Sequence, residues 1–527
     1  MPSILEFVGD LCCCCCKDPS DARFAAGVKA WKKYEQTGES QYLAEAVRNH
    51  QAALDIRVPD HPRRPESLLH TAMSLWAQCQ GAVTKGSSST VIAYYNEALR
   101  LLRHNPDKLG RRAIIYTNLG TVYITLFRLG KEDPEAFPAS GSKIDKAIEN
   151  YRSALQLWLA KDDPDRPISH FNLNNALVQK DMKDDLLNAI NNLREAVELY
   201  MTKPTSRPLL ISSLNTLAKA YQSHHHYSED ISDVVGEVDA LRRVLHLTDE
   251  GKGRLVPLVN LTDALWRLCE IEHNRSNDIE EAVLRGREAL QLSDASDNVI
   301  RAKALAHLAN ALSARYAQIS AKNVADLDQA IQYYRDAIGP DPEDGPDPED
   351  GSVFGYGPDS EDGPDPILCS SLASAIYTRC QDFEEVEGAT LENAIYYNQQ
   401  ALLTCPEDNP LYPRIQNNLG CIYLTQFNKS GVEGDLIKGI EAYEDVVAHC
   451  PDDNDDLADY QETLKDAKRA LQDKREGRQE KLAVPIRPKP PAFSTFRFRR
   501  QRSFMTVSML STQHSDESRL STVASII

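Results

Sequence analysis

Residues 415–427 read IQNNLGCIYLTQF, and residues 436–447 read LIKGIEAYEDVV. In both stretches large apolar residues recur at intervals of three and four, which places them on one face of a helix. They are Leu419, Ile422, Tyr423 and Phe427 in the first stretch, and Leu436, Ile440, Tyr443 and Val447 in the second. Gly420 and Gly439 mark positions where two helices approach closely, because only a small side chain fits there. The segment therefore predicts a pair of packed amphipathic helices.

The pattern of the second stretch recurs along most of the chain. In each repeat a small residue precedes an aliphatic one, and a second such pair begins six positions after that aliphatic residue. The fifth repeat departs most from this rule, because Glu237 and Val244 occupy its small positions. The first pairs begin at Ala46, Val91, Ala147, Ala189, Glu237, Ala282, Ala330, Ala394 and Gly439. Successive spacings are 45, 56, 42, 48, 45, 48, 64 and 45 residues. Repetition at this period predicts an all-α fold, a right-handed α-solenoid of about nine helix pairs.

Each predicted first helix also has its own small position, equivalent to Gly420. Its nine residues are Gly27, Ala72, Gly120, Asn174, Ala218, Thr262, Ala309, Ala373 and Gly420. Only Asn174 and Thr262 are polar exceptions. Prolines such as Pro406 and Pro451 follow predicted second helices, where they end the helix.

These residues resemble a known repeat family. Asn118-Leu119-Gly120 with Tyr123, and Asn418-Leu419-Gly420 with Tyr423, are followed by Ala-Ile-x-x-Tyr-x-x-Ala-Leu patterns such as the one from Ala147 to Leu155. This order resembles the tetratricopeptide repeat (TPR), with a longer loop than the family standard. Units near 45 residues are similar to long TPR arrays of fungal proteins, often placed ahead of a caspase-like CHAT peptidase domain. The resemblance covers about Asp21 to Asp452.

The resemblance implies a scaffold that binds peptide segments or partner helices in a concave groove. In the family, the residue just before the Leu-Gly pair faces that groove. The matching asparagines here are Asn118, Asn172, Asn260 and Asn418. An asparagine can donate to and accept from an extended peptide backbone, whereas the alternative is that it caps or solvates the helix surface. Repeats fill the chain up to its capping helix, so the resemblance implies an array without the CHAT domain.

Composition agrees with a folded, non-catalytic protein. The chain has 527 residues and a formal net charge of −19, with an excess of +5 from Ala483 onward and hence −24 in the rest. An acidic body argues against nucleic acid as the main ligand. We find no Gly-rich phosphate loop, HExxH or GxSxG. We therefore expect no enzyme activity and no cofactor. Neighbouring His224, His225 and His226 point in different directions on a helix, so we expect no metal site there either.

The chain ends predict further features. Residues 1–21 form a Cys-rich segment with the consecutive cysteines Cys12, Cys13, Cys14, Cys15 and Cys16. This run resembles the clustered cysteines of S-acylated proteins. The alternatives are an unmodified disordered end and a poorly arranged metal site. The other cysteines are expected to be small buried residues in a cytosolic protein. We therefore predict a cytoplasmic location, with peripheral membrane contact if the run is acylated.

The remaining boundaries follow from composition. Residues 22–452 form the repeat array, interrupted at 340–366 by an insert with ten acidic and no basic residues. Its Pro, Gly and charge content predicts disorder, with calcium binding as the weaker alternative. Residues 453–482 are expected to form a capping helix, and 483–527 a basic, Ser-rich disordered tail. Ser503, after Arg499, Arg500 and Arg502, resembles a basophilic kinase site; an unmodified tail is the alternative.

Three functions compete on these grounds. The first is a non-catalytic scaffold that binds other proteins through the groove. The second is a membrane-tethered, S-acylated signalling adaptor, which adds to the first and depends on the cysteine run. The third is an enzyme or a remnant of a CHAT-like peptidase, for which no residue of this sequence is nominated.

Overall fold

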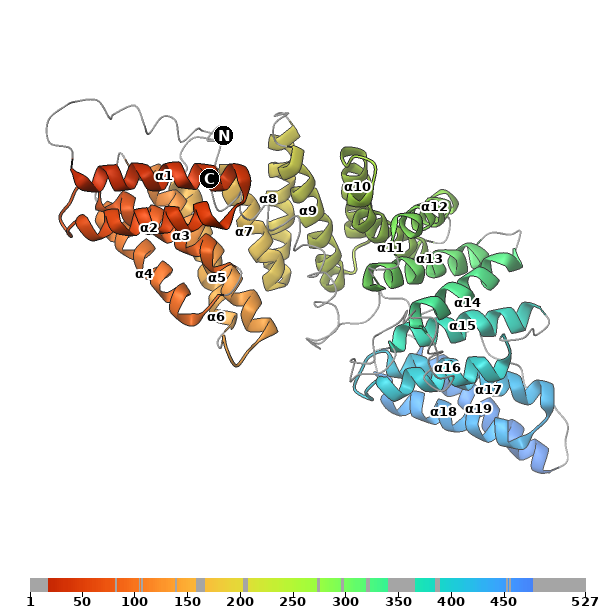
Figure 1. Cartoon of the computed structure of the whole chain (residues 1–527). Helices are drawn as coiled ribbons and strands as arrows, with labels where there is room; N and C mark the ends of the chain where they lie inside the picture. Colours follow the sequence, from red (N-terminus) through yellow and green to blue (C-terminus); the bar gives the residue numbers. More distant parts are fainter. Residues whose placement is uncertain are drawn as a thin grey trace, which may run out of the picture. The chain divides into compact units, whose positions relative to one another are not determined.

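The structure, a computed structural model, describes residues 18–80, 83–103, 105, 108–137, 140–157, 166–201, 207–272, 275–294, 298–318, 323–339, 365–383, 389–451, 454 and 456–476. These residues form nineteen α-helices, which follow one another as nine pairs and a final helix (Figure 1). The all-α prediction, the nine helix pairs and the helix after them are confirmed.

Contacts divide the chain after Ser223, inside α9 (Arg207–Ser228), whereas the sequence predicted one array over 22–452. The first unit contains four complete pairs, in which the two helices pack against each other. They are α1 (Pro19–Thr37) with α2 (Ser40–Ile56), α3 (Arg64–Cys79) with α4 (Lys85–Leu102), α5 (Leu109–Glu132) with α6 (Ser140–Leu157), and α7 (Arg166–Lys180) with α8 (Lys183–Met201).

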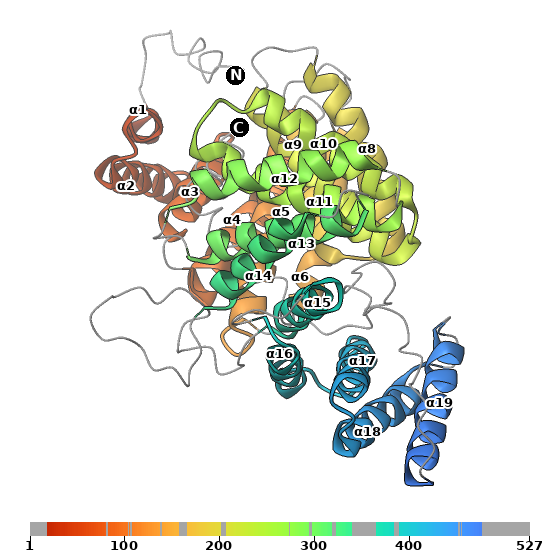
Figure 2. The ribbon, with the colours of Figure 1, turned by 90° about the vertical axis from the view of Figure 1, so that its right-hand side faces the viewer.

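The second unit begins at His224, near the end of α9, and continues with α10 (Ile231–Leu247). Its later pairs are α11 (Leu255–Ile271) with α12 (Ser276–Leu292), α13 (Asn298–Gln318) with α14 (Val324–Ile338), α15 (Pro366–Asp382) with α16 (Leu391–Thr404), and α17 (Tyr412–Ser430) with α18 (Glu433–His449). The last helix, α19 (Leu457–Arg475), lies beside α18 (Figures 1 and 2). It is shorter than the predicted 453–482.

Local sequence signals explain where several helices begin and end. Asp18 caps α1 by accepting a hydrogen bond from the Ser20 amide at 2.8 Å, and α1 ends where Gly38 takes a φ of 70°. Asp365 caps α15 in the same way, and Pro366 is its first residue. These two residues were predicted to belong to the acidic insert, so the described part of the chain resumes its helical order earlier than expected.

The small positions predicted on the first helices are all buried. Each second helix also has a buried residue four positions after its first small residue. We call these nine residues the facing positions. The facing positions are His50, Tyr95, Tyr151, Leu193, Leu241, Gly286, Tyr334, Asn398 and Tyr443. A Cβ atom added to Gly420 would lie 2.7 Å from the Tyr443 ring, and one on Gly120 would overlap Tyr151. Rings on second helices therefore pack directly on first-helix backbone.

The sizes of the paired residues compensate one another. Where the first helix carries the larger Thr262, the second carries Gly286, and a Cβ there would meet the Thr262 methyl at 3.2 Å. Three of the four facing tyrosines, Tyr151, Tyr334 and Tyr443, also bond to the residue after the small position. Tyr334 donates its hydroxyl to Asn310 Oδ1 at 2.5 Å, and the Tyr151 and Thr121 hydroxyls lie 3.3 Å apart. Each such pair thus combines close packing with a satisfied buried hydroxyl.

Candidate functional site

Of the four asparagines predicted to face a groove, two are buried between helices. Asn418 is 0% exposed, and its Nδ2 donates to Ser374 Oγ on α15 at 3.1 Å. Asn118 is 4% exposed and bonds to the side chain of Tyr95. The prediction that these two side chains reach a peptide is therefore wrong, because the position before Leu-Gly serves helix packing in their repeats. Asn172 and Asn260 are only half-buried.

Neighbouring first helices contact each other through polar side chains. In the first unit the hydroxyls of Thr117 on α5 and Ser169 on α7 lie 3.1 Å apart. Further along the same helices, Arg128 Nε donates to Gln179 Oε1 at 3.1 Å. In the second unit Asp263 of α11 and His307 of α13 approach to 3.3 Å, and Gln318 of α13 donates to the Cys269 carbonyl at 2.8 Å. In both units these neighbouring first helices are thus joined through polar side chains.

The polar face of α11 and α13 rests on buried charges. Glu237 occupies a position that carries alanine in most repeats, and both its carboxylate oxygens accept from Arg267 of α11, at 2.7 and 2.8 Å. Arg267 also donates to Asp263 at 2.9 Å. Packing is therefore kept in the repeat that departs most from the pattern, because a bidentate ion pair fills the position.

Burial and charge shift the titration of these groups. Burial raises the pKa of Glu237 to about 7, against the opposing pull of Arg267. Burial alone would also raise the pKa of Asp263, but the attraction of Arg267 and His307 brings it below the usual value. Burial lowers the pKa of His226, at the end of α9, to about 4, and lowers that of His307 as well. His226 is accordingly neutral at pH 7.

Lys303 is the unusual cation of this face. It lies on α13 one helical turn before His307, as Asn260 lies about one turn before Asp263 on α11. Its side chain is half-buried, and burial lowers the pKa of its ammonium group, partly offset by the distant attraction of Asp263. Within the described ranges no carboxylate lies within 4 Å of Lys303. A partly desolvated ammonium without a paired carboxylate is suited to bind one from a ligand.

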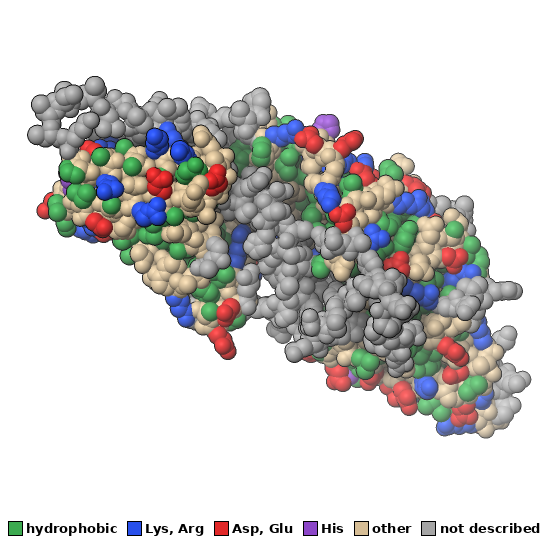
Figure 3. All heavy atoms as spheres, in the orientation of Figure 1, with side chains coloured by type: hydrophobic (Ala, Val, Ile, Leu, Met, Phe, Trp, Pro, Cys, Tyr) green, Lys and Arg blue, Asp and Glu red, His purple; other side chains and the backbone are tan. Residues whose placement is uncertain are grey.

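Sequence reasoning missed both features. Glu237 and Val244 were recognised as departures from the repeat, and a glutamate at an alanine position was the signal that a buried cation should lie nearby. Lys303 carried no such signal, because a lysine on a helix surface is normally solvated. On the face drawn in Figure 3, side chains of both signs are interspersed. Selectivity for a binding partner is therefore expected to depend on local contacts and not on an extended electrostatic field of one sign.

The three adjacent histidines do not converge. His224 Nδ1 lies 2.7 Å from Asp233 Oδ2, whereas His225 Nδ1 lies 3.0 Å from the Asp230 carbonyl oxygen. Ser228 also donates to Asp233 at 2.5 Å. These bonds tie the end of α9 to the start of α10. The described part of the chain holds no group of three or more His, Cys, Asp or Glu side chains arranged for a metal ion.

Several predicted sites lie outside the described residues. These are Cys12 to Cys16, Ser503, and the insert up to residue 364. Among the described cysteines, none of which forms a disulfide, Cys79 is half-buried and the other six are buried. Burial raises the pKa of Cys269 and Cys369 to about 12. The prediction that these cysteines are buried small residues is confirmed for those six. No helix in the described ranges has the length and apolarity to cross a bilayer.

Comparisons with known proteins add the following. No protein-family model and no curated protein matches the chain. Matching solved structures include the TPR domain of P58(IPK), at 14% identity over 87% of this chain and 100% of that one, with a TM-score of 0.21. Yeast Tom70 matches at 12% identity over 86% and 96%, with a TM-score of 0.23. A chain of Naa15/Naa10 bound to HypK-THB matches at 13% over 86% and 67%, with a TM-score of 0.21.

These TM-scores are too low to carry an argument, so the assignment depends on the helix pairs themselves. Nine successive pairs with buried small positions on the first helices agree with the resemblance found in the sequence. The fold is tetratricopeptide-like. In a TPR-like array the first helices of successive repeats lie side by side, as α11 and α13 do here.

Proposed function

We propose that this protein is a non-catalytic scaffold that holds carboxylate-bearing peptide segments of other proteins across the first-helix face of α11 and α13. The observation that carries the proposal is Lys303, a half-buried ammonium group without an ion pair in the described residues. Asn260 on the neighbouring helix offers a donor and an acceptor to the peptide backbone. His307 Nδ1 and Asp263 Oδ1 lie 3.3 Å apart beside this site, so these two residues shape the face next to Lys303.

Replacing Lys303 with methionine tests the site. Methionine keeps most of the stem that packs on the helix but removes the charge. A charge-assisted hydrogen bond contributes about 2 kcal/mol, so we expect the affinity for an acidic peptide to fall about thirtyfold. The measurement is fluorescence anisotropy with the tightest binders from a random peptide library, compared with versions in which Asp and Glu are changed to Asn and Gln.

Arg287 supplies the matched control. It is an exposed cation on α12, the second helix of the repeat before that of Lys303, and its guanidinium donates to Gln329 at 3.3 Å. Arg287→Met removes the same charge at another place and should leave the affinity unchanged. Equal weakening by both substitutions would show that only net charge matters. A Lys303→Met protein that binds acidic peptides as tightly as the wild type would contradict the assignment.

A second proposal concerns the cysteine run from Cys12 to Cys16, which the sequence places ahead of α1. We propose that two or more of these cysteines carry acyl chains and tether the scaffold to a membrane surface. Two chains give stable anchoring, whereas one gives marginal binding. Acyl-exchange labelling of the protein from its own cells should give a signal that disappears when all five cysteines are changed to serine. Equal labelling of the two proteins, with both in the supernatant after fractionation, counts against acylation.

A further inference from the structure

The first helix pair differs from the others at its facing position. His50 is the only histidine among the nine facing residues. Its side chain is fully buried, and a Cβ atom on Gly27 of α1 would lie 2.6 Å from its Nδ1. The ring therefore packs on the backbone of α1 as Tyr151 and Tyr443 do in their own repeats. This contact joins α1 to α2 beside the apolar cluster of Ala30, Trp31, Leu43 and Ala46. The stability of the pair therefore depends in part on the charge state of the imidazole.

The surroundings of His50 suit a neutral ring. Neither Nδ1 nor Nε2 has a hydrogen-bond partner among the residues that the structure describes. The ring lies 5.4 Å from Phe24 of α1 and 5.3 Å from His70 of α3, between centroids, and Phe24 lies 5.0 Å from His70. A protonated imidazole would carry a buried charge and two unpaired donors in this aromatic contact, which is unfavourable.

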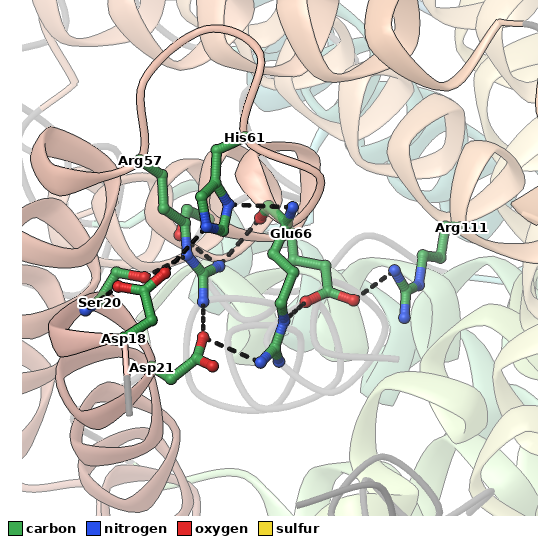
Figure 4. A network of polar contacts seen from close by, with 9 residues as sticks. Asp18, Ser20, Asp21, Arg57, His61, Glu66 and Arg111 are labelled. Carbon is green, nitrogen blue, oxygen red and sulfur yellow. Dashed lines mark hydrogen bonds and ion pairs between the residues drawn. The ribbon is translucent and has the colours of Figure 1, made fainter. Parts of the chain in front are cut away.

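The charged groups nearby increase this cost. Arg57, at the end of α2, is fully buried and lies over the Phe24 ring, with its guanidinium carbon 4.9 Å from the ring centroid. It is held by Ser20 of α1, Ser67 of α3 and the Arg63 carbonyl, at 2.9 to 3.0 Å (Figure 4). Arg57 therefore places a fixed positive charge beside any cation that forms on His50.

The carboxylates of this region are already shared between arginines. Asp21 of α1 accepts from Arg57 at 2.7 Å and from Arg63 at 2.9 Å. Glu66 of α3 pairs with Arg63 at 3.0 Å and with Arg111 of α5 at 2.5 Å (Figure 4). Further pairs join Asp18, before α1, to His61 in the loop after α2, at 2.9 Å, and Arg64 of α3 to Glu97 of α4, at 2.8 Å. The carboxylates around the buried Arg57 are thus already paired, and Asp55 at the end of α2 is exposed.

We propose that the first helix pair is an acid-sensitive element: protonation of His50 opens the contact between α1 and α2 below neutral pH, while a pair without histidine, such as α5 with α6, stays closed. Burial, with added repulsion from His70 and Arg57, lowers the pKa of His50 to about 2 in the closed form. The open form binds a proton at the ordinary histidine pKa of about 6.5. Because the open form binds more protons between these values, stability is full above pH 6.5 and falls as the pH decreases.

The size of the effect follows from the same linkage. At pH 5.5, one unit below the ordinary pKa, the open population rises about tenfold relative to neutral pH from His50 alone. Hydrogen–deuterium exchange of the full chain at pH 7.4 and 5.5, corrected for intrinsic exchange rates, measures it. Between pH 7.4 and 5.5, the protection factors of peptides from Pro19–Thr37 and Ser40–Ile56 should fall about tenfold. Those of peptides from Leu109–Glu132 and Ser140–Leu157 should not change.

Two variants complete the test. His50→Tyr reproduces the Gly120–Tyr151 and Gly420–Tyr443 contacts with a group that does not titrate in this range, and it should remove the tenfold part of the acid-induced loss that His50 contributes. Any loss that remains is assigned to His70, because burial lowers its pKa to about 4 as well. His61→Gln removes the nearby half-buried histidine and should keep the acid-induced loss. If His50→Tyr leaves α1 and α2 unprotected at pH 7.4, His50→Leu takes its place, following Leu193 and Leu241. No loss in the wild type, or the same loss with and without His50, would overturn the proposal.

Discussion

Replacing Gly420 with tryptophan is expected to lower the free energy of unfolding of the second unit by at least about 3 kcal/mol. The Cβ atom alone would lie 2.7 Å from the Tyr443 ring, so either α17 must move away from α18 or the ring must leave its site. Overpacking in a dense core costs about 1–3 kcal/mol even when neighbours can adjust, and here one neighbour is a fully buried ring against backbone. Chemical denaturation followed by circular dichroism measures the change.

A size exchange shows whether this loss comes from the contact itself. Tyr443→Ala should lower the free energy of unfolding by about 3–5 kcal/mol because it opens a cavity. Gly420→Leu should lower it by about 1–3 kcal/mol because it overpacks the same contact. The double variant places the larger residue on the first helix, as Thr262 and Gly286 are placed in their repeat. We expect it to be more stable than the sum of the single effects by about 1–3 kcal/mol. Strictly additive losses would mean that the two positions do not pack on each other.

Replacing Arg57 with methionine should destabilise the first unit by about 3 kcal/mol. The substitution leaves the Ser20 and Ser67 hydroxyls and the Arg63 carbonyl without their buried donor, and Asp21 loses one of its two arginines. Removing one member of a buried ion pair costs about 3–5 kcal/mol, and the partial exposure of Asp21 places this case at the lower end. Thermal and denaturant unfolding of the full chain would measure it.

Arg63 provides the comparison for this effect. It shares Asp21 with Arg57, but its side chain is 37% exposed. Ion pairs at such exposure contribute about 0–1 kcal/mol. Arg63→Met should therefore cost much less than Arg57→Met. Equal losses of stability in the two variants would show that the buried hydrogen bonds of Arg57 to the two serines and the carbonyl add no stability beyond the shared ion pair.

Much of the fold was predictable because helix packing leaves a regular mark on the sequence. Small residues such as Gly420 must recur wherever two helices touch, and their spacing predicted nine helix pairs. The facing positions are less regular, since tyrosine, leucine, histidine, glycine and asparagine all occur there. Their role depends on the size of the residue opposite, which only the structure shows. The boundary within α9 likewise depends on contacts between helices and has no local signal.

The candidate site was less predictable for a physical reason. Asn418 and Asn172 occupy the same register position, yet one is buried against α15 and the other is half-buried. How far a side chain at that position reaches solvent depends on how closely the neighbouring first helix approaches, and local sequence does not set this distance. Lys303 could not be singled out either, because its lack of a counter-ion is a property of three neighbouring helices.

A hydrogen–deuterium exchange footprint of a bound partner tests the central claim most directly. The partner is the tightest acidic peptide of the library, added at saturation to the full chain. The account predicts increased protection in Leu255–Ile271 and Asn298–Gln318, the first helices α11 and α13, with the effect lost in Lys303→Met and kept in Arg287→Met. Protection confined to the second helices Ser276–Leu292 and Val324–Ile338, or an unchanged footprint in Lys303→Met, would contradict it.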